Sequence, residues 1–139
     1  MHSLILFAGL LAFFLLLSAF FSGSETAFMA VNRLRLRHRA ESGDRKAQLI
    51  RRLADNPDRL LAVILLGNTI ANIAAASILT YVVTSHAPRD RADTLSMLAT
   101  AALTLVVLIF CELTPKILAA ANAEAATERL IHPVRAALW

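Results

Sequence analysis

Apolar residues are gathered into three long runs, separated by two polar segments. The runs cover about 3–31, 60–84 and 94–113, and no charged residue lies between Leu60 and Val83. About 20 predominantly apolar residues are enough to cross a bilayer as a helix. The pattern therefore predicts an all-α membrane protein, with residues 1–139 forming one transmembrane domain of three spans.

Polar residues interrupt or end each run next to a glycine or a proline. The interruptions are Ser22-Gly23-Ser24-Glu25-Thr26, Gly67-Asn68 with Asn72, and Glu112-Leu113-Thr114-Pro115. Gly/Ser pairs and prolines are recurrent sites of helix kinks and ends, so we expect a bend near Ser22-Gly23-Ser24 and a helix end at Pro115. Irregular backbone at membrane depth needs burial or a cavity, so we expect the three interruptions to meet.

The first polar segment, 32–59, is strongly basic and holds nine of the fourteen Lys and Arg residues. Ser42-Gly43-Asp44 predicts a turn between two short helices. The second segment, 85–93, balances Arg89 and Arg91 against acidic neighbours. The positive-inside rule then predicts a cytoplasmic basic loop and an N-terminus outside.

Residues 116–131 form an alanine-rich, moderately amphipathic segment that is too polar to cross a membrane alone. We expect a juxtamembrane helix there, ended by His132-Pro133, on the cytoplasmic side. Long arginine side chains can reach lipid headgroups, so we expect the basic loop to lie against the membrane face.

Composition supports membrane insertion and excludes several classes of protein. Apolar residues make up 58% of the chain and charged residues 17%, whereas soluble domains are roughly 45–50% apolar. The net charge of +4 comes from one loop without interleaved aromatic residues, which indicates topology rather than nucleic-acid binding.

No Lys or Arg precedes the first run, which argues against a cleaved signal peptide. An enzyme is the least favoured class, because no nucleophile–base pair, HExxH motif or phosphate loop occurs.

The polar interruptions carry the candidate chemistry. Asn68 and Asn72 are four residues apart and share a helix face, and Glu112 is an intramembrane carboxylate, which by default suggests a functional site. Oxygen ligands suit magnesium or calcium, whereas zinc or copper would call for imidazole or thiolate. All four histidines lie elsewhere and Cys111 is the only cysteine. A structural role is the alternative: Ser and Asn often only bond neighbouring helices, and Glu112 could pair with Lys116 at i+4.

Three motifs in order resemble the transmembrane domain of the CorC/CNNM magnesium transporters. They are Phe20-Phe21-Ser22-Gly23-Ser24-Glu25-Thr26-Ala27, Leu66-Gly67-Asn68-Thr69 with Asn72, and Cys111-Glu112-Leu113-Thr114-Pro115-Lys116. The spacing and the basic loop between the motifs match as well, and the resemblance covers essentially the whole chain.

The resemblance implies a homodimer in the plasma (inner) membrane, each subunit with three transmembrane helices and a juxtamembrane helical belt. It also implies that a largely dehydrated magnesium ion binds among the spans. The ion site it implies contains Ser22, Ser24, Asn68, Asn72 and Glu112, with the Gly67 or Cys111 carbonyl as backbone ligand. The family is described as exporting Mg2+ in exchange for Na+, under control of a cytoplasmic ATP-binding CBS module. That module is absent from these residues, so we expect the transmembrane portion of a longer protein.

A second hypothesis belongs to a different class. The chain could be a membrane anchor and dimerisation platform for that missing cytoplasmic part. The small residues Gly67, Ala71 and Ala75 recur at i+4 and would allow another backbone to approach closely. Under this hypothesis they would form the dimer contact.

Overall fold

Every regular element of the structure, a computed structural model that describes all 139 residues, is a helix. Two long rods are α1 (His2–Ala30) and α4 (Pro57–His86). A third rod runs without a break through α5 (Ala92–Val106), the π-helix η1 (Val107–Leu113) and α6 (Thr114–Ala121). The shorter helices are α2 (Arg33–Glu41), α3 (Arg45–Ala54) and α7 (Ala123–Leu138). The expected all-α fold is confirmed.

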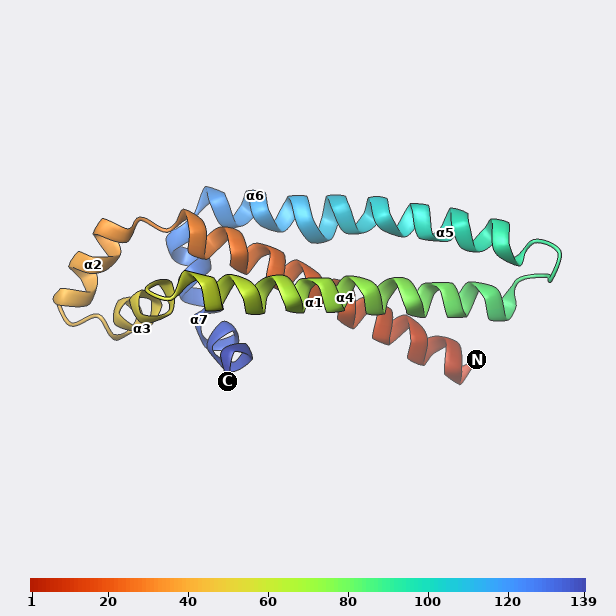
Figure 1. Ribbon diagram of the computed structural model, residues 1–139, viewed down its shortest axis with the longest axis horizontal. Coiled ribbons are helices and arrows are strands. Elements are labelled where there is room, and N and C mark those ends of the chain that lie inside the picture. Colours follow the sequence, from red (N-terminus) through yellow and green to blue (C-terminus); the bar gives the residue numbers. More distant parts are fainter.

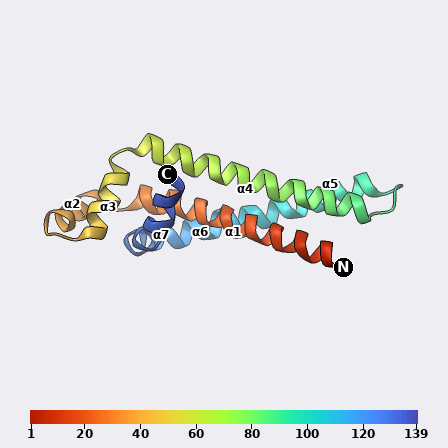
Figure 2. The ribbon, with the colours of Figure 1, turned by 90° about the horizontal axis from the view of Figure 1, so that it is seen from below.

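The three rods share one long axis, and the short helices gather at one end of it. Figure 1 shows the N-terminus and the α4–α5 connection at one end, with α2, α3, α7 and the C-terminus at the other. The view from below in Figure 2 gives the same separation. The basic segment and the C-terminal helix therefore lie together, opposite the N-terminus.

All three rods are long and apolar enough to cross a membrane. Their outward faces carry large apolar side chains, and Leu65, Leu66, Ile70 and Ile73 are each at least 50% exposed. Soluble monomers rarely expose contiguous apolar surface on this scale. The bundle therefore completes its burial in lipid.

Local sequence explains how the basic segment folds. The Asn32 side chain caps α2 by accepting from the backbone N–H groups of Leu34 and Arg35, both at 3.1 Å. Asp44 caps α3 in the same way, accepting from Lys46 at 3.0 Å. Between the two helices Gly43 adopts φ 96°, a left-handed conformation that favours glycine. The predicted turn at Ser42-Gly43-Asp44 is present.

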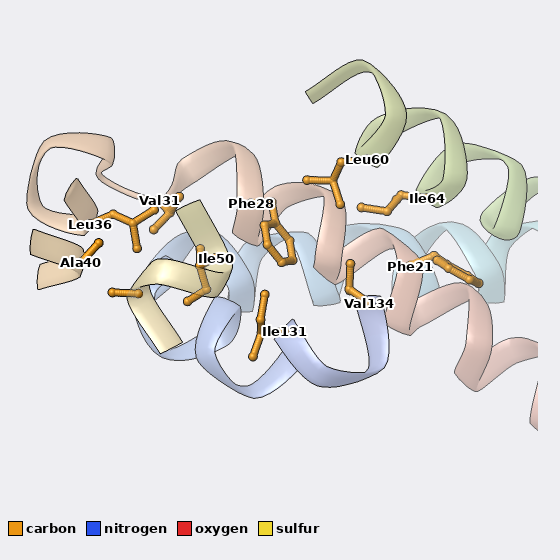
Figure 3. Packing of buried hydrophobic residues seen from close by; sticks show 11 residues of the cluster. Phe21, Phe28, Val31, Leu36, Ala40, Ile50, Leu60, Ile64, Ile131 and Val134 are labelled. Atoms are coloured by element: carbon orange, nitrogen blue, oxygen red, sulfur yellow. The ribbon is translucent and has the colours of Figure 1, made fainter. Parts of the chain in front are cut away.

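A compact apolar cluster joins the short helices to the rods (Figure 3). Phe28 of α1 lies among Ile50 of α3, Leu60 of α4 and Ile131 of α7 in this cluster. Thr127 adds a polar link, because its hydroxyl donates to the Ala27 carbonyl at 3.1 Å. Helix α7 is thus fixed against the end of α1.

The third rod continues through Pro115, where we expected the helix to end. Proline lacks an N–H, so the Cys111 carbonyl has no donor at i+4. The backbone widens into η1 immediately before this point, and the Thr114 hydroxyl donates to the Ile109 carbonyl at 2.7 Å. The helix therefore accommodates the missing hydrogen bond by widening one stretch of its backbone, and it does not break.

Two further breaks expected from the sequence are also absent. Helix α1 is continuous through Ser22-Gly23-Ser24, and Gly23 lies against Pro115, whose Cβ would be 3.5 Å from a Cβ built on the glycine. Helix α7 passes through Pro133 because Ile131 and Val134 on either side of it are buried in the apolar cluster.

Candidate functional site

A polar cluster lies between the three rods, inside otherwise apolar helix surfaces. Ser18 of α1 is fully buried, and its hydroxyl oxygen is 2.9 Å from Asn68 Oδ1 and 2.7 Å from Asn72 Oδ1. A hydroxyl carries one hydrogen, so it can donate to only one of these amide oxygens at a time. The cluster therefore holds more acceptor oxygens than donors at this point.

Glu112 of η1 enters the same cluster from the third rod. Asn72 Nδ2 donates to Glu112 Oε1 at 3.4 Å, and no basic side chain lies within 4.0 Å of this carboxylate. Lys116 instead pairs with Glu25 at 3.4 Å. The alternative in which Glu112 forms an ion pair with Lys116 is therefore wrong.

Ser22 connects α1 to the irregular backbone of the third rod. It is fully buried, one helical turn after Ser18, and its hydroxyl donates to the Glu112 carbonyl at 3.3 Å. The wide turn of η1 and the missing N–H of Pro115 disturb the regular hydrogen bonding of this stretch. A side chain from α1 thus satisfies a main-chain oxygen beside the candidate carboxylate.

The structure joins Ser22, Asn68, Asn72 and Glu112 by hydrogen bonds, with Ser18 between them. Ser18 was missed from the sequence because it lies within an uninterrupted apolar run. Its only sequence signal is the i−4 spacing from Ser22, which puts both hydroxyls on one face of a continuous helix. Had α1 been read as unbroken, this spacing would have identified it.

Ser24 and Cys111 are buried but are not joined to the cluster. The Ser24 hydroxyl donates to the Phe20 carbonyl of its own helix at 2.7 Å. A continuous helix turns by about 200° over two residues, so Ser24 and Ser22 face different neighbours. Cys111 is buried within η1.

Gly67 has a packing role that its sequence position did not reveal. A Cβ at this position would overlap the ring of Phe21 on α1. Ala71 and Ala75 follow on the same face and are 0% and 1% exposed. Because this small-residue face is filled within one chain, it is not available as the dimer contact that the anchor hypothesis required.

An open groove gives access to the cluster from the side of α5. Its volume is about 280 Å³, just below the range of roughly 300–1,000 Å³ that is typical of small-molecule pockets. Asn72 and Glu112 line it together with the hydroxyl-bearing Thr100 and Thr104. The groove is suited to an ion with water rather than to a large organic molecule.

Outside the spans, a charged network holds the basic segment to α7. Arg39 lies 2.6 Å from both Asp44 and Glu128. The Arg39 guanidinium donates hydrogen bonds to the Glu128 and Asp44 carboxylates, and these raise the pKa of Arg39 above its usual value, Glu128 more than Asp44. The backbone N–H of Ala47 and the Arg39 guanidinium lower the pKa of the Asp44 carboxyl. The α2–α3 turn is thereby coupled to the C-terminal helix.

Comparison with known proteins agrees with this architecture. Residues 9–139 match the family described as the Cyclin M transmembrane N-terminal domain. The chain is 45% identical over 104 residues to the UPF0053 inner membrane protein YfjD of Escherichia coli, covering 75% of this chain and 23% of that protein. It is 42% identical over 110 residues to a UPF0053 protein of Haemophilus influenzae, covering 79% and 25%.

A more distant relative is a chloroplastic DUF21 domain-containing protein of Arabidopsis thaliana. It is 33% identical over 125 residues, which are 90% of this chain and 18% of the relative. The chain thus spans about a quarter or less of the length of these relatives. The family match extends over nearly all of the chain, and the three apolar rods fit a membrane domain. The chain belongs to the Cyclin M transmembrane domain family, as the three sequence motifs indicated.

Proposed function

We propose that this domain binds a largely dehydrated Mg2+ ion among its three rods and transports it across the membrane. The observation that carries the proposal is the Glu112 carboxylate, which lies within an apolar rod and has no basic partner within 4.0 Å. A desolvated carboxylate without a counter-ion is unfavourable. A bound cation would supply the missing charge.

The surrounding side chains are suited to a hard cation. The Asn72 amide adjoins the carboxylate itself, and Ser22 bonds the main-chain carbonyl of the same residue. Ser18 and Asn68 extend this hydrogen-bonded cluster beyond Asn72 with further hydroxyl and amide oxygens. Magnesium prefers six oxygen ligands in octahedral geometry, often with only one or two carboxylates. No three His, Cys, Asp or Glu side chains come together in the chain, so neutral oxygens would provide most of the protein ligands.

Ion binding at Glu112 requires Asn72 to change its hydrogen bonding. In the structure the amide nitrogen of Asn72 donates a hydrogen bond to the Glu112 carboxylate. A cation bound to that carboxylate would repel the N–H group. Rotation of the amide would exchange nitrogen for oxygen toward the ion. Carbonyls of Gly67 and Cys111 are candidate further ligands by family resemblance.

We further propose that the protein exports Mg2+ in exchange for Na+, that it forms a homodimer, and that its basic segment faces the cytoplasm. The basic segment and the N-terminus lie at opposite ends of the rods (Figure 1), which supports placing them on opposite sides of the membrane. Orientation can be tested by introducing Ser42→Cys or Ser85→Cys into a Cys111→Ser background. An impermeant maleimide applied outside intact cells should label only the second variant.

Calorimetric titration of the detergent-purified chain with Mg2+ tests the ion site. We expect saturable binding and a raised thermal midpoint, both removed by Glu112→Gln. Glu124→Gln is the matched control, because Glu124 is a carboxylate outside the spans that pairs with Arg35 at 3.6 Å. Equal Mg2+ protection of the Glu112→Gln and Glu124→Gln variants would contradict the proposal.

The anchor hypothesis is separated from transport by Asn68→Ala. Loss of Mg2+ binding with a folded chain supports the ion site, whereas unchanged binding and a lower thermal midpoint indicate a packing role. Flux of Mg2+ into vesicles, with and without a Na+ gradient, then tests direction and coupling.

A further inference from the structure

A second polar site lies at the end of the molecule where the short helices gather, away from Glu112. A pocket of about 440 Å³ opens where α3, the start of α4 and the end of α7 meet. Arg52, Arg59 and Arg135 line it, one from each of these helices, and no acidic residue does. We propose that this pocket binds the headgroup of an anionic phospholipid.

The three arginines are available for an anionic ligand. Each is exposed, and none has a carboxylate within 4.0 Å. By contrast, Arg35, Arg37 and Arg39 in the same basic segment all have acidic partners. Guanidinium groups match phosphate oxygens in charge and in planar geometry. The pocket therefore brings together three guanidinium groups that have no acidic partner.

The remaining lining residues favour a lipid over a soluble anion. Leu49, Leu53, Leu60 and Leu138 form an apolar wall beside the arginines. Leu60 is the first residue of the charge-free stretch of α4, so the pocket lies where that rod leaves the hydrocarbon region. A phospholipid presents a phosphate and acyl chains at this same boundary.

The pocket is held in shape by a contact between two of its walls. Arg59 Nη2 donates to the Leu138 carbonyl at 3.0 Å, which joins the start of α4 to the end of α7. Trp139 lines the same pocket. Tryptophan is enriched at the membrane interface.

Trp139 also makes the proposal measurable, because it is the only tryptophan in the chain. Its fluorescence should be quenched by lipids with brominated acyl chains that bind the pocket. In neutral micelles of the purified chain, brominated phosphatidylglycerol should quench at lower concentration than brominated phosphatidylcholine. One arginine near an anionic lipid is worth about fivefold in affinity, so Arg135→Gln should reduce the preference by about that factor.

A matched pair of triple variants separates a pocket from diffuse attraction. Arg52→Gln/Arg59→Gln/Arg135→Gln should abolish the preference for phosphatidylglycerol. Arg33→Gln/Arg45→Gln/Lys46→Gln removes the same charge from exposed residues without ion pairs and outside the pocket, and should retain most of the preference. Equal losses in the two triples would overturn the proposal.

Inorganic phosphate distinguishes a lipid from a soluble anion. If phosphate at the concentration of the lipid removes the quenching difference, the pocket is a soluble-anion site and the lipid proposal fails. If the quenching difference between the two lipids persists in phosphate, the lipid proposal is supported.

Circular dichroism of both triple variants should show unchanged helicity. If the pocket triple variant does not fold, the loss of lipid preference in the single Arg135→Gln variant tests the proposal instead.

Discussion

Asn72 and Glu112 meet across the bundle, with the amide Nδ2 of one 3.4 Å from Oε1 of the other. They come from different rods and lie 40 residues apart in the chain. A neutral amide thus occupies the place where a basic side chain would neutralise the carboxylate. The pair links the packing of α4 against the third rod to the proposed binding of a cation.

Asn72→Ala should remove both functions of this side chain. Without Mg2+ we expect the free energy of unfolding to fall by about 1–3 kcal/mol, because a buried polar partner is lost. With Mg2+ the variant should gain little or no thermal protection. Thr69→Ala is the control, since the Thr69 hydroxyl is exposed and bonds only the Leu65 carbonyl of its own helix. Full protection of Asn72→Ala by Mg2+ would separate this residue from the ion site.

Ser18→Ala tests the residue that the sequence did not reveal. Loss of its hydroxyl removes the one donor that lies within 2.9 Å of both amide oxygens, so the expected destabilisation is about 1–3 kcal/mol. Ser77→Ala should stay within about 0.5 kcal/mol, because its exposed hydroxyl bonds the Ile73 carbonyl. Chemical unfolding of both variants in the same detergent makes the comparison. Similar effects of the two substitutions would show that the Ser18 contacts add no stability.

Gly67→Ala should destabilise the bundle through overpacking. The new methyl group would overlap the Phe21 ring, and overpacking typically costs about 1–3 kcal/mol. Adding Phe21→Leu should recover part of the loss by making room. Gly9→Ala is the control, because a Cβ there meets no atom within 4 Å. A lower thermal midpoint for Gly67→Ala without any rescue would point to a cause other than the ring.

The Asp44 turn should weaken in acid. Its pKa in the folded chain is lowered from an ordinary value of 3.8. The stabilisation is therefore complete above that ordinary value and is lost as the pH falls through the lower, folded-state pKa. Asp44→Asn retains a capping side chain but cannot titrate. Thermal midpoints measured between about pH 5 and pH 2 should fall more steeply for the wild type than for Asp44→Asn. Parallel curves would exclude this carboxylate as a source of the acid response.

The coarse architecture was predictable because it follows from local rules. Apolar runs of span length specify three rods, and Asn32, Gly43 and Asp44 carry the cap and turn chemistry that bounds α2 and α3. These features depend on neighbours in sequence. The convergence of Asn68, Asn72 and Glu112 was anticipated from the cost of leaving polar groups unsatisfied in lipid.

The errors arose where tertiary contacts outweigh local preference. Pro115 and Pro133 were expected to end helices, but the wide turn of η1 carries the third rod through Pro115, and the buried Ile131 and Val134 maintain α7 through Pro133. The second hypothesis placed Gly67 at a contact with another chain, whereas Phe21 of the same chain fills the space above it. Only the three-dimensional arrangement identifies which partner a small residue accommodates. Which side chains ligate an ion remains a prediction.

The π-helix has a consequence for how this chain tolerates changes in length. A π-turn holds one more residue than an α-turn, so η1 is equivalent to an α-helix with an insertion. Deleting one residue from Val107–Leu113 could restore regular α-helical hydrogen bonding without breaking the rod. Because the extra residue is held in the wide turn, such a deletion would leave α5 and α6 in nearly the same rotation about the rod axis. A deletion within the regular turns of α5 would instead rotate the residues before it by about 100° and present a different set of side chains to α4.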